Sequence, residues 1–165
     1  MPAVLFVCRE NQFRSPIAAA CLRQIIRQDF PDEHWVVGSA GTWAENGLRA
    51  PKLTLDVAQK YKLSGLKKHI SRQVTTKLLA SADLVIVMEI GQKEALRYEF
   101  QSAARYIYQI TEIVEDITYD IGDLNDSRIS SEDIGDTLIQ LISRGSPKIL
   151  ELARKLHSER NSIPK

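Results

Sequence analysis

The sequence is poor in cysteine: Cys8 and Cys21 are the two thiols among 165 residues. Two cysteines cannot make a disulfide framework or a four-ligand zinc site. A chain of this size buries about 70% of the surface of its unfolded form, so it needs no such crosslinks to fold. The low cysteine content therefore predicts a reduced, cytoplasmic protein.

The sequence also lacks an excess of charge of either sign, and it has no long apolar run. The chain has 22 Lys and Arg against 21 Asp and Glu, a net charge of +1, which argues against binding nucleic acid over a broad basic face. A local basic pocket remains compatible with this balance. No apolar run approaches the ~20 residues of a membrane span. The N-terminus has no basic region and no small-residue cleavage site, so we expect no secretory signal and no membrane partner.

The residues that are present predict an α/β protein. Hydrophobic residues make up 44% of the chain and charged residues 26%, which is typical of a globular protein, and we expect residues 1–165 to form one domain. The expected strands are 3–7, 35–38, 84–88 and 106–110, and the expected helices are 15–30, 51–63, 75–81, 92–100 and a long C-terminal helix. Strands that alternate with helices predict a three-layer α/β/α sandwich with a four-stranded parallel sheet. Residues 39–50 and 120–131 read as loops.

The C-terminal segment carries an apolar stripe at helical spacing from Ile134 to Leu156. Such a stripe fits a helix that packs on the core or, alternatively, a coiled coil, and we favour the core-facing helix. Pro147 interrupts the stripe and should kink or split the helix, because proline lacks the backbone N–H that a helix needs.

The first loop carries the residues with chemistry. It reads Cys-Arg-Glu-Asn-Gln-Phe-Arg-Ser over residues 8–15, and we expect Ser15 to cap the helix that Pro16 opens. In a parallel sheet this loop lies at the carboxyl ends of the strands, where ligands bind. Five residues between Cys8 and Arg14 let backbone N–H groups converge on an anion, and the helix N-terminus adds positive potential.

Cys8 and Arg14 are the candidate catalytic residues of this loop. Arg14 offers a planar fork of donors to two phosphate oxygens. The same positive field favours the thiolate of Cys8, to which the Ser15 hydroxyl can donate a hydrogen bond. The alternative is a buried cysteine at a strand end and a surface arginine without function. The other residues expected to line the phosphate site are Arg9, Glu10, Asn11, Gln12 at the loop tip, Phe13 and Ser15.

The sequence resembles a known family at this loop and beyond it. VLFVCRENQFRSPIAAACLR resembles the N-terminal signature of the low-molecular-weight protein tyrosine phosphatases. Three later segments are also similar to that family: VGSAGT at 37–42, HISRQVT at 69–75 and ADLVIVME at 82–89. The resemblance implies a four-stranded parallel sheet between helices. It also implies hydrolysis of phosphomonoesters through a phosphocysteine, without a metal or another cofactor.

The resemblance further implies a general acid on a late loop, where the family has an Asp-Pro pair. Asp123 matches that aspartate by its place shortly before the last helix. The reaction needs such a carboxyl group because the leaving oxygen must be protonated. Asp120 and Asp126 are rival candidates, and a solvated acidic turn is the alternative to all three.

Several positions depart from the family pattern, among them three in or near the expected site. Glu10 stands in place of a glycine that tolerates φ > 0, so its carboxylate must point outward or form a pair, for example with Arg9. Phe13 replaces a second cysteine that can form a protective disulfide with the nucleophile in relatives, and Leu124 replaces the proline of the Asp-Pro pair. Cys21 lies about two helical turns into the first helix, so we expect it in the core.

Residues outside the first loop complete the expected site. Trp43 either stacks on a substrate ring or is a partly buried residue of the protein. Ser39 and Asn11 are candidates for the hydrogen bond that holds the loop in a left-handed turn, since asparagine tolerates φ > 0. We expect His69 and Asp83 to form a structural polar pair.

Three functions compete at this point. The favoured one is a phosphatase, monomeric or weakly dimeric, that acts on a phosphorylated protein or a small phosphomonoester. A phosphate-binding regulatory pseudophosphatase is the alternative, because Glu10 and Leu124 depart from the family pattern. The third is a thiol reductase of the arsenate-reductase type, which needs additional cysteines, and Cys21 alone is available for that role.

Overall fold

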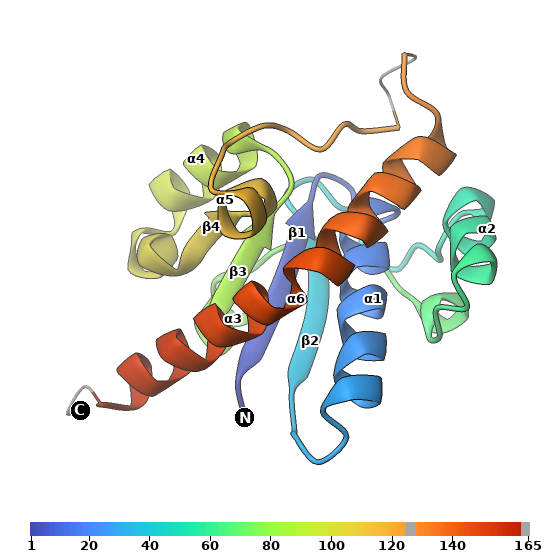
Figure 1. Ribbon diagram of the computed structural model, residues 1–165. Coiled ribbons are helices and arrows are strands. Elements are labelled where there is room, and N and C mark those ends of the chain that lie inside the picture. The colour runs from blue at the N-terminus through green and yellow to red at the C-terminus, as the bar shows by residue number, and fades with distance from the viewer. Residues whose placement is uncertain (125–127, 163–165) are drawn as a thin grey trace.

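The fold is built on four parallel strands whose order in the sheet is β2-β1-β3-β4. The computed structural model describes residues 1–124 and 128–162. Its strands are β1 (Ala3–Cys8), β2 (Val36–Gly41), β3 (Leu84–Val87) and β4 (Ile107–Gln109). β1 lies in the centre and pairs in parallel with β2 and β3, and Cys8 lies opposite Gly41 at the carboxyl end. The expected four-stranded parallel sheet is confirmed (Figure 1).

Helices cover both faces of this sheet, which confirms the three-layer sandwich. The helices are α1 (Arg14–Asp29), α2 (Lys52–Lys60), α3 (Thr76–Ser81), α4 (Ile90–Glu99), α5 (Ile110–Glu115) and α6 (Ser131–Ser162), with 3₁₀ turns η1 (Leu66–Lys68) and η2 (Gln101–Tyr106). Alternate residues of β1 enter two separate cores: Phe6 packs in the core with α1, α2, α5 and α6, and Val7 packs in the core with α3, α4 and η2. Because β1 is buried on both faces, its sequence is continuously apolar. None of the described helices is long and apolar enough to cross a membrane.

Several expected boundaries are wrong. β2 continues to Gly41, so residues 39–41 are strand and not loop, because they stay paired with β1 as far as Cys8. Two further errors have a local cause. The run 106–110 is not one strand, because β4 ends at Gln109 and Ile110 already begins α5. Gln109 and Glu112 form a reciprocal capping box at that point, and an apolar first turn of a helix cannot be told from a strand by its composition. Ser15 is not the N-cap of α1, since the helix begins at Arg14 and Phe13 occupies the cap position.

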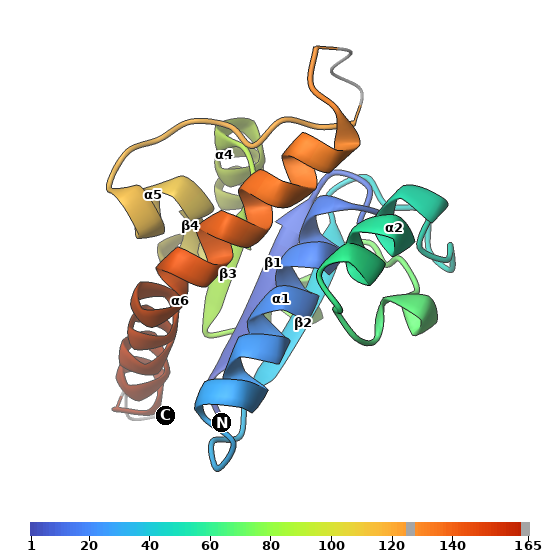
Figure 2. The ribbon, with the colours of Figure 1, turned by 45° about the vertical axis from the view of Figure 1, so that its right-hand side comes forward.

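α6 continues through Pro147 as one helix, so the proline does not split it. Proline cannot donate to the carbonyl of Ser143, and the hydroxyl of Ser146 donates to that oxygen instead, at 3.2 Å. In Figure 2 the C-terminal half of α6 runs in a different direction from its N-terminal half, as a proline kink produces. The apolar stripe, including Ile134 and Leu156, is buried on the core, so the core-facing helix is confirmed.

Gly145 lets α6 pack closely against α5. A Cβ atom at this position would lie 2.2 Å from Cγ2 and 2.8 Å from Cγ1 of Val114. We expect Gly145→Ala to lower the free energy of unfolding by about 2–3 kcal/mol, since neither helix can move without disturbing the core. Gly91→Ala in α4 is the matched control, because nothing lies within 4 Å of its added Cβ. Urea unfolding should leave the control equal to or slightly more stable than the wild type; equal losses in both variants would contradict the packing argument.

Candidate active site

The first loop, residues 9–13, lies at the carboxyl ends of β1 and β2. The chain after β2 is tied to it by two backbone bonds, from Thr42 N–H to the Cys8 carbonyl (2.9 Å) and from Trp43 N–H to the Arg9 carbonyl (2.8 Å). Gly41 permits this approach, since a Cβ there would lie 2.5 Å from the Arg9 oxygen. The end of β2 therefore forms one side of the loop.

Cys8 and Ser15 meet beneath this loop. The Cys8 Sγ lies 3.0 Å from the Ser15 Oγ, and both side chains are buried. The Ser15 hydroxyl also lies 3.2 Å from the Ala40 carbonyl oxygen and accepts a hydrogen bond from the Asn11 amide at 3.0 Å. A hydroxyl has one hydrogen, so Ser15 can donate either to Ala40 or to the sulfur. Ser15 thus supports the thiol from within α1 although it does not cap that helix.

Asn11 fixes the backbone conformation of the loop. Its φ is 56°, the left-handed value expected for this residue. Its side-chain Nδ2 donates to Ser15 and, at 2.9 Å, to Ser39, while its Oδ1 accepts from the backbone N–H of Arg72 at 3.0 Å. The expected contact between Ser39 and Asn11 is present. One fully buried side chain therefore connects β2, α1 and the chain near residue 72.

His69 also supports the loop, and its expected pairing with Asp83 is wrong. His69 Nε2 lies 2.7 Å from the Asn11 carbonyl oxygen, and because that oxygen can only accept, Nε2 carries the hydrogen. Burial lowers the pKa of His69, which favours the neutral ring. Asp83 instead binds the N–H of Ala3 and the ring of His157, where the N-terminus and α6 meet. The two residues serve different parts of the molecule.

Arg14 is buried and held by two carboxylates. Its Nη1 pairs with Glu89 and donates to the Ile121 carbonyl at 2.8 Å, and its Nη2 pairs with Asp123 at 2.8 Å. Such pairing offsets the cost of burying a guanidinium, whose side chain is 1% exposed. An arginine has five N–H donors, and these three bonds leave the Nε–H and one Nη2–H. Guanidinium N–H donors of this kind suit the oxygens of an oxyanion.

Asp120 and Asp123, in the acidic loop before α6, have different partners. Asp123 faces Arg14 with Oδ2, while its Oδ1 accepts from Leu124 N–H at 2.8 Å. Asp120 instead accepts from Ile90 N–H at 2.8 Å and from the Gln109 amide at 3.0 Å, so it anchors the start of α4. Asp126 lies outside the described residues. Of the two described candidates, Asp123 is the one bound to Arg14.

Glu10 and Phe13, which depart from the family pattern, are both accommodated in the loop. Glu10 and Arg9 are both exposed, so the carboxylate of Glu10 is solvated rather than buried beside the loop. The left-handed residue of the loop is Asn11, and Glu10 is not required to adopt a positive φ. Phe13 is buried in the core as the residue before α1. Glycine and cysteine are therefore not needed at these two positions to build the loop.

Trp43 and Gln12, the remaining residues expected to line the site, differ in their exposure to solvent. Trp43 is 78% exposed, so partial burial is excluded and its ring stands free beside the loop. Gln12 is half-buried, and its backbone carbonyl accepts from the Thr54 hydroxyl of α2 at 2.6 Å. Trp43, Arg9 and Glu89 contribute to the lining of a hollow of about 240 Å³.

Sequence reasoning missed the supporting role of four residues: Thr54, His69, Arg72 and Glu89. For Glu89 a signal existed, because it follows the buried strand β3 as Cys8 ends β1, and parallel strands place such residues at one edge. Thr54 lies in an expected helix whose contact with the loop no sequence signal indicates, and His69 and Arg72 lie outside the regular helices and strands.

Neither cysteine is part of a disulfide in the structure. Cys21 packs in the core of α1 and α6, as expected, and its sulfur lies 4.0 Å from the Ser143 hydroxyl. Burial raises the pKa of Cys21 to about 11, which keeps it a neutral thiol. Across residues 1–124 and 128–162, no group of three or more His, Cys, Asp or Glu side chains is arranged to hold a metal ion.

Comparison with known proteins identifies the family. The family model for low molecular weight phosphotyrosine protein phosphatases matches residues 3–161. The chain belongs to this family. It is therefore a cysteine-dependent phosphatase, and the resemblance seen in the sequence is confirmed.

Individual relatives of the chain carry two different substrate names. A protein-arginine-phosphatase of Bacillus subtilis (strain 168) is 31% identical over 132 residues, which cover 79% of this chain and 83% of the relative. A solved arginine phosphatase with a phosphorylated active site serine has a TM-score of 0.81 at 26% identity, covering 93% of this chain and 99% of that one. The tyrosine phosphatase Wzb from Escherichia coli K30, in complex with sulphate, has a TM-score of 0.73 at 28% identity, covering 94% and 99%.

The burial of His69 beside the loop makes stability depend on pH. The folded-state pKa of His69 lies below its ordinary value of 6.5, so the unfolded chain binds the proton more strongly. We expect the free energy of unfolding to fall as the pH drops below 6.5, and His69→Gln, which does not titrate, to reduce that fall. Urea unfolding of both proteins at about pH 7.5 and about pH 5.5 measures the difference. Equal pH dependence in the two proteins would show that His69 does not contribute.

Proposed function

We propose that this protein removes phosphate from phosphorylated protein side chains through a phosphocysteine on Cys8. The observation that carries the proposal is the convergence of the Cys8 sulfur, the Ser15 hydroxyl 3.0 Å away and the N-terminus of α1, which begins at Arg14. The N-terminus of a helix and a curled loop attract a phosphate dianion, and they also favour a thiolate. Nucleophile and electrophile are thereby brought to one place.

In the first step, the phosphate binds the loop N–H groups and the two remaining donors of Arg14. The Cys8 thiolate attacks phosphorus on the side opposite the leaving oxygen, forming the S–P bond as the P–O bond breaks. The charge on the equatorial oxygens stays bound to Arg14 and the loop throughout. Ser15, whose hydrogen can turn to either partner, stabilises the thiolate before the attack.

Asp123 supplies the proton to the leaving oxygen. It lies against Arg14, the residue that holds the phosphate, so its carboxyl group is near the reacting centre. A phosphate dianion bound by Arg14 competes with Asp123 for that ion pair, which leaves the carboxyl group beside the leaving oxygen. In the second step the resulting carboxylate takes a proton from water, which attacks phosphorus, breaks the S–P bond and regenerates the thiolate.

The substrate class that we propose is a phosphotyrosine-type phosphoprotein. Trp43, exposed and tied by its backbone to Arg9, provides an aromatic surface on which a phenyl ring can stack. The tyrosine phosphatase names of several relatives support this assignment.

Phosphoarginine is the second candidate, because the relative with 31% identity is named a protein-arginine-phosphatase. Comparing kcat/KM for one peptide bearing phosphotyrosine or phosphoarginine at the same position distinguishes the two. A higher value for phosphotyrosine supports our assignment, and a higher value for phosphoarginine replaces it.

We further propose that the chain works as one domain in the cytoplasm, as a monomer or a weak homodimer. The two free thiols and the burial of Cys21 are consistent with a reducing compartment. Light scattering across a concentration series tests the assembly state.

Replacing the nucleophile gives the first test of the mechanism. We expect Cys8→Ser to lower kcat for p-nitrophenyl phosphate, assayed with EDTA, by at least about 10⁴-fold, since an alcohol is far less nucleophilic than a thiolate. Cys21→Ala is the control and should keep its activity, because Cys21 packs away from the loop in the core of α1 and α6. Retention of activity in Cys8→Ser would rule out the phosphocysteine route.

The general acid is tested by paired aspartate variants. Asp123→Asn should lower kcat by about 10²–10³-fold and make the rate more sensitive to the pKa of the leaving group. Asp120→Asn should change kcat little, because asparagine keeps an oxygen that can accept from Ile90 N–H. Measuring kcat over a series of aryl phosphates separates the two variants. A larger loss in Asp120→Asn would reverse the assignment.

A further inference from the structure

A groove of about 800 Å³ lies between α2 and the segment that follows it through η1. Its apolar side chains include Leu55, Ala58, Leu63 and Leu66. The connection from α2 to η1 contains two left-handed residues, with φ values of 54° at Lys62 and 88° at Gly65. At the floor of the groove Leu55 is partly buried, and Ala58, Leu63 and Leu66 are buried residues of the core.

The rim of this groove is positively charged. Lys62, Lys67 and Lys68 line it, all three are exposed, and none forms an ion pair with another residue in the described part of the chain. The one acidic residue on the rim, Asp56, is paired with Lys52 at 2.7 Å. In a protein with a net charge of only +1, three uncompensated lysines around one groove form a local positive field.

Both walls of the groove are connected to the first loop by single hydrogen bonds. From α2, the buried Thr54 hydroxyl donates to the Gln12 carbonyl at 2.6 Å. From the other wall, His69, which directly follows Lys68, donates to the Asn11 carbonyl at 2.7 Å. The groove is therefore built on the same two segments that hold the loop in place.

We propose that this groove docks an acidic segment of the phosphoprotein substrate, with aliphatic side chains on the apolar floor and carboxylates at the three lysines. Charge complementarity selects acidic chains, and the floor favours a segment that also carries leucine-like residues. That the bound protein is a substrate rests on the proposed phosphatase function; the binding itself does not.

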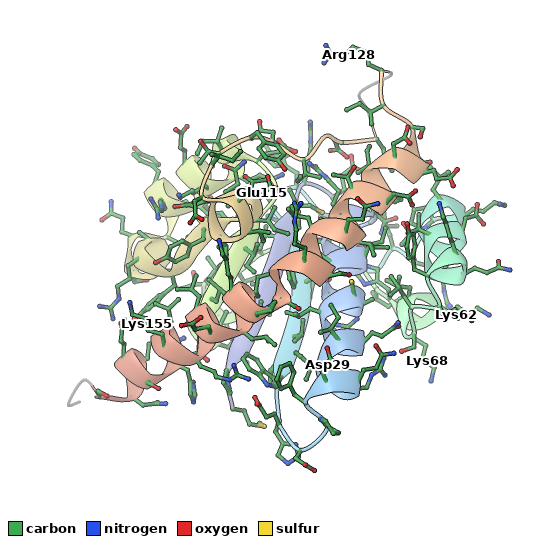
Figure 3. All side chains as sticks on the ribbon, in the orientation of Figure 1. Asp29, Lys62, Lys68, Glu115, Arg128 and Lys155 are labelled. Atoms are coloured by element: carbon green, nitrogen blue, oxygen red, sulfur yellow. The ribbon has the colours of Figure 1, made fainter. Side chains whose placement is uncertain are left out.

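Binding can be measured without catalysis. The probe is a fluorescently labelled, non-phosphorylated peptide of alternating glutamate and leucine residues, and the readout is its anisotropy. Lys62→Gln combined with Lys68→Gln should weaken binding about fivefold, because two exposed charge contacts are lost. Lys77→Gln combined with Lys155→Gln is the control with the same charge change elsewhere, and it should bind as the wild type does. Figure 3 shows Lys62 and Lys68 on neighbouring segments and Lys155 on the distant half of α6.

The outcomes are distinct. Weaker binding in the groove variant alone supports the site, and added salt should weaken wild-type binding further. Equal weakening in both variants shows a non-specific charge effect and overturns the proposal. Binding of the wild type to phosphatidylserine vesicles but not to the peptide also overturns it, in favour of a lipid surface. Activity on p-nitrophenyl phosphate should be the same in all three proteins, and its absence would refute the phosphatase function without affecting the docking result.

Discussion

The left-handed turn at Asn11 is the constraint on which the rest of the site depends. Its φ of 56° curls the loop, and its side chain satisfies that strained geometry through bonds to Ser15, Ser39 and the backbone of Arg72. A largely buried polar network of this kind specifies one conformation, because an unmade bond at the buried Asn11 or Ser15 leaves a polar group without a partner. Through Ser15, whose hydroxyl lies 3.0 Å from the Cys8 sulfur, this turn supports the nucleophile of the proposed mechanism.

Arg14 imposes the second constraint, since a buried guanidinium must be paired. Glu89 after β3 and Asp123 on the late loop supply the pairs, and the Ile121 carbonyl takes a further hydrogen. This arrangement draws three distant segments to the carboxyl edge of the sheet. The same contacts that stabilise the fold therefore orient the residue proposed to bind substrate.

Much of the fold could be predicted from the sequence because its signals are local. Buried parallel strands are continuously apolar, and α6 carries its stripe at helical spacing, so their existence and type follow from pattern. The wrong predictions fall at positions where the same local sequence pattern fits two different structures. The apolar run at residues 106–110 contains both the end of β4 and the start of α5, and Ser15 has a good capping side chain that instead turns inward to Cys8. Pro147 is tolerated because Ser146 satisfies the carbonyl that proline leaves free.

The sequence by itself determined the chemistry of the first loop: a cysteine at a strand end, five residues, an arginine and a serine are contiguous, so no tertiary information was needed to group them. Only the tertiary structure decided what surrounds them. Asp123, and not Asp120, pairs with Arg14. His69 binds the Asn11 carbonyl of the loop and not Asp83, and Glu10 is exposed to solvent. These partners lie far apart along the chain, and contacts between distant segments depend on how strands and helices pack, which spacing along the sequence does not encode.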